Sequence, residues 1–160
     1  MPRGFTIIET VMVMVIVAIL SVVLLLRWGA SDKARLDSSV RKIVSDIRYA
    51  QKLSVSSQTR AGIIFYPDSY EVYAVINSTP PTLANSPGEP CSTDSSGKFV
   101  VNFTQGRCKE FEGVTLSYIT NTISFDSIGG LVNSTGEDIT VNYKGSKTLS
   151  IENSTGRVSY

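Results

Sequence analysis

The chain has 160 residues, of which 42% are hydrophobic, with 15 Lys and Arg against 14 Asp and Glu and no His. A net charge of +1 provides no strong field for nucleic acid or acidic lipid, and the lack of His removes the commonest general base and metal ligand. The length allows one membrane helix plus one domain of about 100 residues, and we expect no enzymatic activity, metal or cofactor.

The first element is an apolar stretch from Val11 to Leu26 that contains no charge, Pro or Gly. Because a helix needs about 20 mostly apolar residues to cross a hydrocarbon core, residues 5–26 are predicted to form a transmembrane helix. Glu9 is the exception, since a carboxylate at mid-membrane costs roughly 2.5–3.5 kcal/mol on insertion scales. We therefore expect a partner that neutralises Glu9.

Three interpretations of this N-terminus compete. A secretory signal peptide has a shorter apolar centre and a small-residue cleavage site, and no such site follows Leu26. A plain membrane anchor explains the length and Arg3, but leaves Glu9 and Gly4 unexplained. In the third interpretation residues 1–4 are a leader removed before Phe5. The new α-amine would then lie one helical turn from Glu9 and could pair with it, within one chain or between copies.

At Gly4, Phe5 and Glu9 the chain closely resembles the type IV pilins and type II secretion pseudopilins. In that family a prepilin peptidase cleaves after the Gly of the leader, the following Phe is N-methylated, and a Glu stands five residues into the mature chain. The resemblance implies cleavage between Gly4 and Phe5, methylation of Phe5 and an assembly role for Glu9. The implied partners are other pilin or pseudopilin subunits, an inner-membrane assembly platform and, before assembly, membrane lipid.

Residues 27–57 are predicted to continue the helix as an amphipathic segment. Apolar residues recur at spacings of 4, 3, 4 and 3 at Leu36, Val40, Ile43, Ile47 and Ala50, with Val44 beside them. Charged residues occupy the rest of the cylinder, namely Asp37, Arg41, Lys42, Asp46 and Arg48. No Pro interrupts the segment, so one helix is expected from about Phe5 to Ser57; two helices meeting at Gly29 are the alternative.

Residues 58–160 are predicted to form an extracytoplasmic, soluble β-sheet domain. Short β-rich runs separated by turns lie at residues 61–66, 70–76, 98–103, 114–119, 122–125, 138–143 and 147–151, with a final strand near 156–158. Residues 77–97 are rich in Pro, Ser, Thr and Gly and are expected to be a surface loop. The predicted fold class is α+β, pilin-like, with a long N-terminal helix packed on an antiparallel sheet.

Cys91 and Cys108 both follow the apolar segment, so that this topology places them outside the cytoplasm. A single Cys pair in an oxidising compartment most often forms a disulfide, which is our prediction. Two reduced thiols or a metal-binding pair are the alternative.

The segment from Phe125 to Val158 looks like the minor pilins and the H-type pseudopilins, which favours a minor structural subunit over a major pilin. The protein is then expected in the inner membrane, as a single-pass store, and later in an extracellular or periplasmic filament. Some minor pilins that resemble this segment bind DNA. The candidates for such binding here are Lys144, Lys147 and Arg157, with Arg107 and Lys109 in the Cys region, although nearby Glu137, Asp138 and Glu152 weaken the patch.

Overall fold

The computed structural model describes residues 6–88, 91, 96–104, 106–132 and 137–160, apart from the side chains of residues 23–30, 106, 107 and 109. The chain divides into two compact units, Met1–Ala34 and Arg35–Tyr160.

Helix α1 spans Ile7–Ser57 and has helical backbone through Gly29, so the alternative of two helices is not what the structure shows. The helix ends where Gln58 takes a positive φ of 55°, the left-handed conformation that commonly terminates helices. Within the second unit the predicted stripe faces inward, since Val40, Ile43 and Ile47 are fully buried. The spacing of 3 and 4 residues therefore identified the buried face of this helix.

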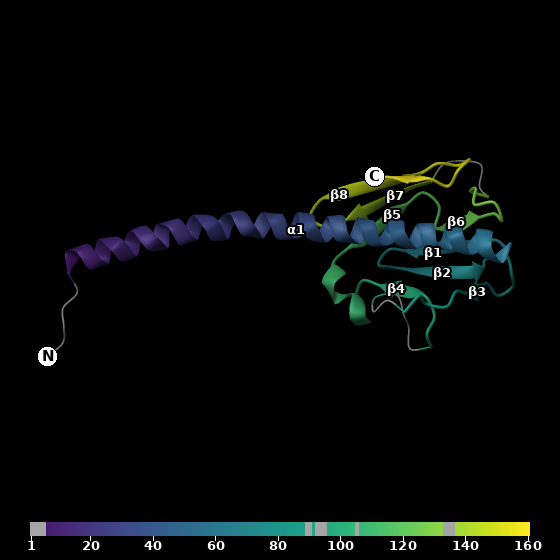
Figure 1. The fold of residues 1–160 in the computed structure, drawn as a ribbon, viewed down its shortest axis with the longest axis horizontal. Helices are drawn as coiled ribbons and strands as arrows, with labels where there is room; N and C mark the ends of the chain where they lie inside the picture. The colour runs from purple at the N-terminus through teal and green to yellow at the C-terminus, as the bar shows by residue number, and fades with distance from the viewer. Residues whose placement is uncertain (1–5, 89–90, 92–95, 105, 133–136) are drawn as a thin grey trace. The chain divides into compact units, whose positions relative to one another are not determined.

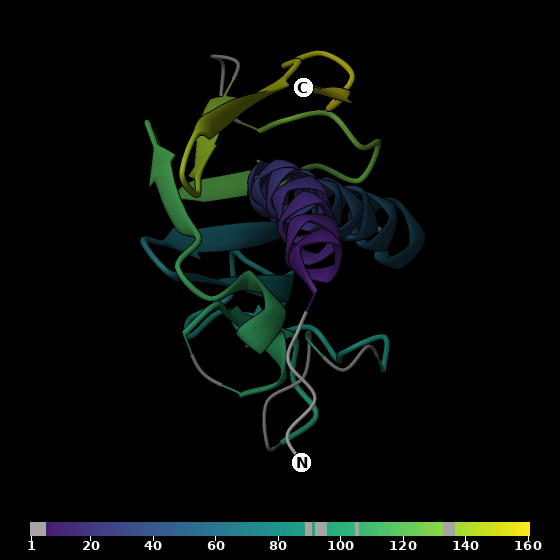
Figure 2. The same cartoon turned by 90° about the vertical axis from the view of Figure 1, so that its left-hand side faces the viewer.

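The strands of the second unit form two antiparallel sheets in the described residues rather than the single sheet expected (Figure 1 and Figure 2). The five-stranded sheet has the order β3-β2-β1-β6, with β4 also paired to β2. Its strands are β1 Ala61–Tyr66, β2 Ser69–Val75, β3 Thr82–Leu83, β4 Val100–Asn102 and β6 Thr122–Phe125. The four-stranded sheet has the order β5-β7-β8-β9, formed by β5 Thr115–Tyr118, β7 Glu137–Asn142, β8 Ser146–Ile151 and β9 Val158–Ser159.

The pairing of the strands defines the two sheets. Strand β1 has β2 on one edge and β6 on the other, so both of its ladders are occupied. Although β5 directly precedes β6 along the chain, it pairs with β7 instead. The runs 61–66 and 122–125 have the predicted bounds, and the other predicted strands differ by one or two residues. The short strand β3 and the 3-10 helix η1, Gly106–Phe111, were not predicted.

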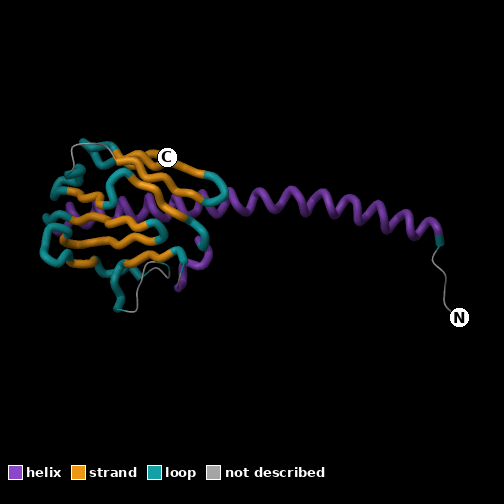
Figure 3. The backbone as a smooth tube through the Cα atoms, turned by 180° about the vertical axis from the view of Figure 1, so that it is seen from behind, coloured by secondary structure: helices purple, strands orange, loops and turns teal. Residues whose placement is uncertain are grey.

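The rear part of α1 covers one face of both sheets. Figure 1 shows this part of the helix in front of the strands, and Figure 3, from behind, shows the strands in front of the helix. The buried side chains of the helix and of both sheets form one hydrophobic cluster, which includes Phe65, Val72, Phe125, Val141 and Leu149. This core fixes the face of α1 that is left for solvent.

Asp46 is buried, whereas the sequence pattern predicted it on the polar side of the helix, and that prediction was wrong. Its residue exposure is only 3%, because Lys42 and the Tyr70 hydroxyl satisfy the carboxylate inside the core. A buried charge is tolerated where it is paired and hydrogen-bonded. The spacing of apolar residues gives no sign of such a partner on a distant strand.

Candidate assembly site

The front of α1 presents apolar side chains on every side. From Ile7 to Val22 all side chains are exposed, with Ile7 at 86% and Met14 at 67%. A helix that is apolar all round is normally buried in a protein core or in a membrane. The first unit therefore carries a surface that requires a non-aqueous cover.

The few polar side chains of this segment do not form a polar face. The Ser21 hydroxyl donates to the Val17 carbonyl at 2.7 Å, and the Thr10 hydroxyl donates to the Thr6 carbonyl at 3.4 Å. Both hydroxyls thus bond to the helix's own backbone, as Ser and Thr often do in apolar surroundings. What remains for a partner is an apolar surface with one charge, Glu9.

Glu9 lies in the first turn of α1, where its backbone N–H donates to the Thr6 carbonyl at 3.1 Å. The positive end of the helix dipole favours a carboxylate at this place. Gly4 and Phe5, the predicted cleavage and methylation residues, lie outside the described residues. The pairing of Glu9 with a processed N-terminus stays a prediction.

Within the part of the chain that the structure describes, no helical segment is both long and apolar enough to cross a membrane. The range 5–26 predicted as a membrane span extends beyond the described side chains at both ends, and it stays a prediction.

A buried polar network holds α1 on the five-stranded sheet. The Lys42 ammonium donates to both carboxylate oxygens of Asp46 at 2.8 Å, and the Tyr70 hydroxyl from β2 donates to the same carboxylate at 2.5 Å. The spacing of Lys42 and Asp46 by four residues was visible in the sequence. Tyr70, the third member, lies 24 residues after Asp46, and no pattern in the sequence indicates that it joins them.

A second polar contact fixes the end of the helix. The Gln51 amide donates to the carbonyls of Gly129 at 2.7 Å and Thr155 at 2.9 Å. Gly156 has a positive φ of 63°, and a Cβ there would lie 2.6 Å from the Gly129 carbonyl oxygen. Two distant turns thus converge on one helical side chain, and Gly156 permits their close approach.

Cys91 and Cys108 form the predicted disulfide, with their Cα atoms 4.8 Å apart. Cys108 belongs to η1 and is buried in the core cluster. The bond ties the 77–97 region to the segment that precedes β5.

The structure does not gather the three predicted DNA-binding residues into one patch. Lys147 pairs with Asp37 at 2.7 Å. Lys144 lies in the turn before β8, and the Arg157 carbonyl accepts from the Glu152 N–H just past the other end of β8. The six residues of β8 separate Lys144 from Arg157 by roughly 20 Å at a strand rise of about 3.3 Å. Arg107 and Lys109 belong to η1, and their side chains lie outside the described ones.

Known proteins are similar to this chain in the N-terminal motif and in the fold. Residues 2–25 match the family model described as the prokaryotic N-terminal methylation motif. The fold is similar to that of the type IV minor pilin FimU of Pseudomonas aeruginosa, with a TM-score of 0.52 and 17% sequence identity over 81% of this chain and 90% of that one. A second crystal form of FimU gives a TM-score of 0.51 and 17% identity over 77% and 90%. A comparison with curated proteins gives no match.

The two positive results confirm the resemblance to type IV pilins, in the N-terminal motif and in the fold. The predicted α+β class, with an N-terminal helix packed on antiparallel strands, is confirmed as well.

Proposed function

We propose that this chain, which carries the N-terminal methylation motif of type IV pilins and a pilin fold, is a minor structural subunit of a type IV pilus or a type II secretion filament. The observation that carries the proposal is the combination, in one chain, of that motif with the exposed apolar front of α1. The likeness to a minor pilin over most of both chains supports the choice of a minor subunit. The role is structural, and no catalytic step is assigned to any residue.

The proposed mechanism begins with processing. A prepilin peptidase cleaves between Gly4 and Phe5, and Phe5 is N-methylated. Before assembly, residues 5–26 hold the protein in the inner membrane, with residues 58–160 outside the cytoplasm. An assembly platform then transfers the helix from lipid to the helices of neighbouring subunits in a periplasmic or extracellular filament.

The exposed apolar surface explains why such a transfer is energetically feasible. The side chains from Ile7 to Val22 leave lipid and enter a bundle of similar helices, so that they are kept from water in both states. The apolar term therefore changes little between the two environments. A nearly balanced transfer can be directed by the assembly machinery.

Glu9 provides the specificity that apolar contacts lack. A neighbour's methylated amine at Phe5 would pair with the Glu9 carboxylate at one axial offset between helices. At other offsets the carboxylate is left buried and unpaired, which costs about 3–5 kcal/mol. This difference would fix the register of the subunit in the filament.

The test compares Glu9→Ala with Ser21→Ala in the native host, by immunoblotting the membrane fraction and the filaments sheared from cells. Ser21 is a matched control because it is a polar residue of the same exposed surface whose hydroxyl donates to the Val17 carbonyl of its own helix. We expect both variants at wild-type levels in the membrane. Glu9→Ala should fall at least tenfold in filaments, whereas Ser21→Ala should not change.

Normal incorporation of Glu9→Ala into filaments would contradict the role of Glu9. If the wild-type protein itself were missing from every sheared filament and envelope assembly, the proposed function would be wrong.

A further inference from the structure

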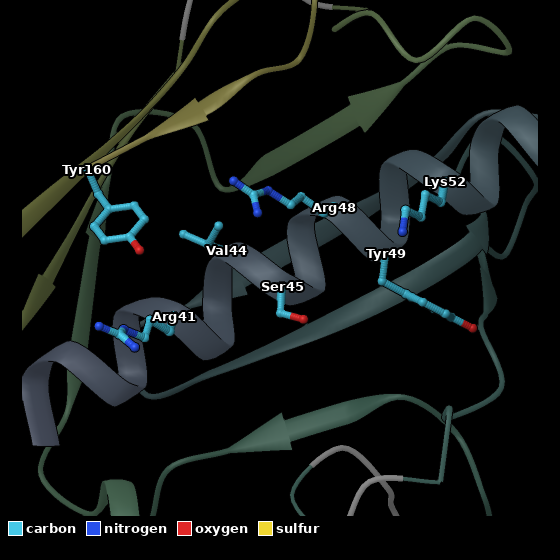
Figure 4. Close-up of a pocket in the computed structure, with 7 residues that line it drawn as sticks. All are labelled: Arg41, Val44, Ser45, Arg48, Tyr49, Lys52 and Tyr160. Atoms are coloured by element: carbon cyan, nitrogen blue, oxygen red, sulfur yellow. The ribbon is translucent and has the colours of Figure 1, made fainter.

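The outward face of α1 in the second unit has its own sequence pattern. It presents five exposed residues at spacings of 3, 4, 3 and 4, namely Ser38, Arg41, Ser45, Arg48 and Lys52. These positions lie opposite the buried stripe that packs on the sheets. Figure 4 shows Arg41, Ser45, Arg48 and Lys52 following one another along the helix. Two small and three cationic side chains therefore lie along one line.

This line borders a groove of about 440 Å³. Figure 4 shows Tyr160 on one side of the helix, near Val44 and Arg41, and Tyr49 on the other side. Val44 is only 4% exposed and Tyr160 is 60% exposed, so the groove has an apolar floor and an aromatic wall. We name these seven residues, Arg41, Val44, Ser45, Arg48, Tyr49, Lys52 and Tyr160, the basic groove.

The three cations of the basic groove differ from Lys42 and Lys147 of the same unit. Lys42 is paired with Asp46, and Lys147 is paired with Asp37. Arg41, Arg48 and Lys52 form no ion pair with any residue that the structure describes, and no carboxylate side chain lines the groove. A line of unpaired cations attracts an anionic partner.

We propose that the basic groove docks an acidic α-helix of a partner protein. At a helical rise of about 1.5 Å per residue, Arg41 and Arg48 lie about 10.5 Å apart, and Arg48 and Lys52 about 6 Å apart. A second helix with carboxylates separated by 7 and 4 residues reproduces both intervals. Guanidinium groups suit this role because they bind carboxylates with two parallel hydrogen bonds.

The small residues of the line favour a helix over other anionic partners. Ser38 and Ser45 stand seven residues apart, on either side of Arg41, and leave room for side chains of a helix that lies along α1. The apolar floor at Val44 can receive one apolar side chain of that helix. A partner helix thus matches the groove in spacing, charge and polarity.

The partner is a different protein surface, not the same face of a second copy. Two copies that met through this face would place three unpaired cations against three more, and like charges across an interface oppose association. This inference goes beyond the proposed assembly function, since it concerns the second unit and holds whether or not Glu9 sets a filament register.

The test measures binding of a fluorescent helical peptide to the full chain in neutral detergent, by fluorescence anisotropy at low and high salt. The peptide is Ala-rich with Glu at intervals of 7 and 4 residues on one face, and a scrambled peptide of equal charge is the reference. The variant reverses the groove charges through Arg41→Glu, Arg48→Glu and Lys52→Glu. Three exposed ion pairs between the groove and the peptide together contribute about tenfold to the affinity. We therefore expect this variant to bind the peptide at least tenfold more weakly.

A matched control reverses three exposed cations outside the groove, through Arg60→Glu, Lys144→Glu and Arg157→Glu. It changes the net charge by the same amount and should alter the affinity less than about twofold. If circular dichroism shows that the triple Glu variant is unfolded, the variant with Gln at the three groove positions replaces it. Its affinity for the peptide should be about tenfold lower than that of the wild type.

Three results would overturn the proposal. These are equal weakening by the groove and control variants, equal binding of the scrambled peptide, and absence of binding at low salt. A single-stranded oligonucleotide that displaced the peptide and bound more tightly, with the same dependence on the groove residues, would assign the groove to nucleic acid instead.

Discussion

Removal of the cation from the buried network should weaken the second unit more than any loss of a surface ion pair. The Lys42 and Asp46 side chains are 12% and 5% exposed, and the Lys42 ammonium lies 2.8 Å from both carboxylate oxygens. We choose Lys42→Met because Met keeps an apolar stem beside the ring of Phe99, where the ammonium lies 5.5 Å from the ring centroid. The change therefore isolates the loss of charge.

The expected loss follows from leaving Asp46 buried without its cation. Breaking a buried pair by removing one partner costs about 3–5 kcal/mol. The Tyr70 hydroxyl still donates to the carboxylate and offsets part of this loss, so we expect about 3 kcal/mol. Adding Asp46→Asn removes the unpaired charge and keeps an acceptor for Tyr70. The double variant should therefore recover most of the stability.

Lys147→Met serves as the control, because Lys147 and Asp37 are 41% and 47% exposed and such pairs are worth less than about 1 kcal/mol. The free energy of unfolding is measured by urea titration of the full chain in detergent, followed by the near-ultraviolet circular dichroism of the tyrosines. The reasoning is refuted if Lys42→Met destabilises no more than Lys147→Met, or if the double variant is as unstable as the single one.

Two further predictions concern a glycine and a tyrosine. Gly156→Ala should lower the free energy of unfolding, measured by thermal unfolding, by at least about 2 kcal/mol, because its φ is +63° and a Cβ there would collide with backbone. Gly88→Ala is the control, since its φ is +89° with open space around it, and it should lower the free energy of unfolding by about 1 kcal/mol. Equal losses would disprove the close-approach argument. Burial, and then the adjacent carboxylate of Glu71, raises the pKa of Tyr73 above its ordinary value near 10. Because the folded state favours the neutral phenol, the stability linked to Tyr73 is complete below pH 10 and is lost as the pH rises from there toward the folded-state pKa. Glu71→Gln should lower that pKa in a phenolate absorbance titration, with Tyr73→Phe identifying the signal, and an unchanged midpoint would contradict this account.

Local patterns in the sequence predicted the helix face and the strand that depend only on the spacing of nearby residues. The 3 and 4 spacing from Leu36 to Ala50 identified the buried face of α1, and the run 61–66 gave β1 with its observed bounds. Such features follow from periodicity, since side chains at these intervals share one face. The Gly4, Phe5 and Glu9 pattern was sufficient to suggest the family.

The sequence did not predict features that depend on residues brought together by the fold. The burial of Asp46 requires Tyr70 from a strand, and the pairing of Lys147 with Asp37 joins residues 110 positions apart. The two-sheet arrangement depends on which strands pair with one another, which no single run encodes. The same reasoning explains why three basic residues near the C-terminus looked like a patch and yet do not lie together.

The most direct test of the filament-subunit account is the intact mass of the protein extracted from membranes of its native host. The account predicts a chain that lacks residues 1–4, carries one added methyl group of about 14 Da at Phe5, and is about 2 Da lighter because Cys91 and Cys108 are oxidised. A full-length, unmethylated chain would contradict processing by a prepilin peptidase and, with it, assembly into a filament.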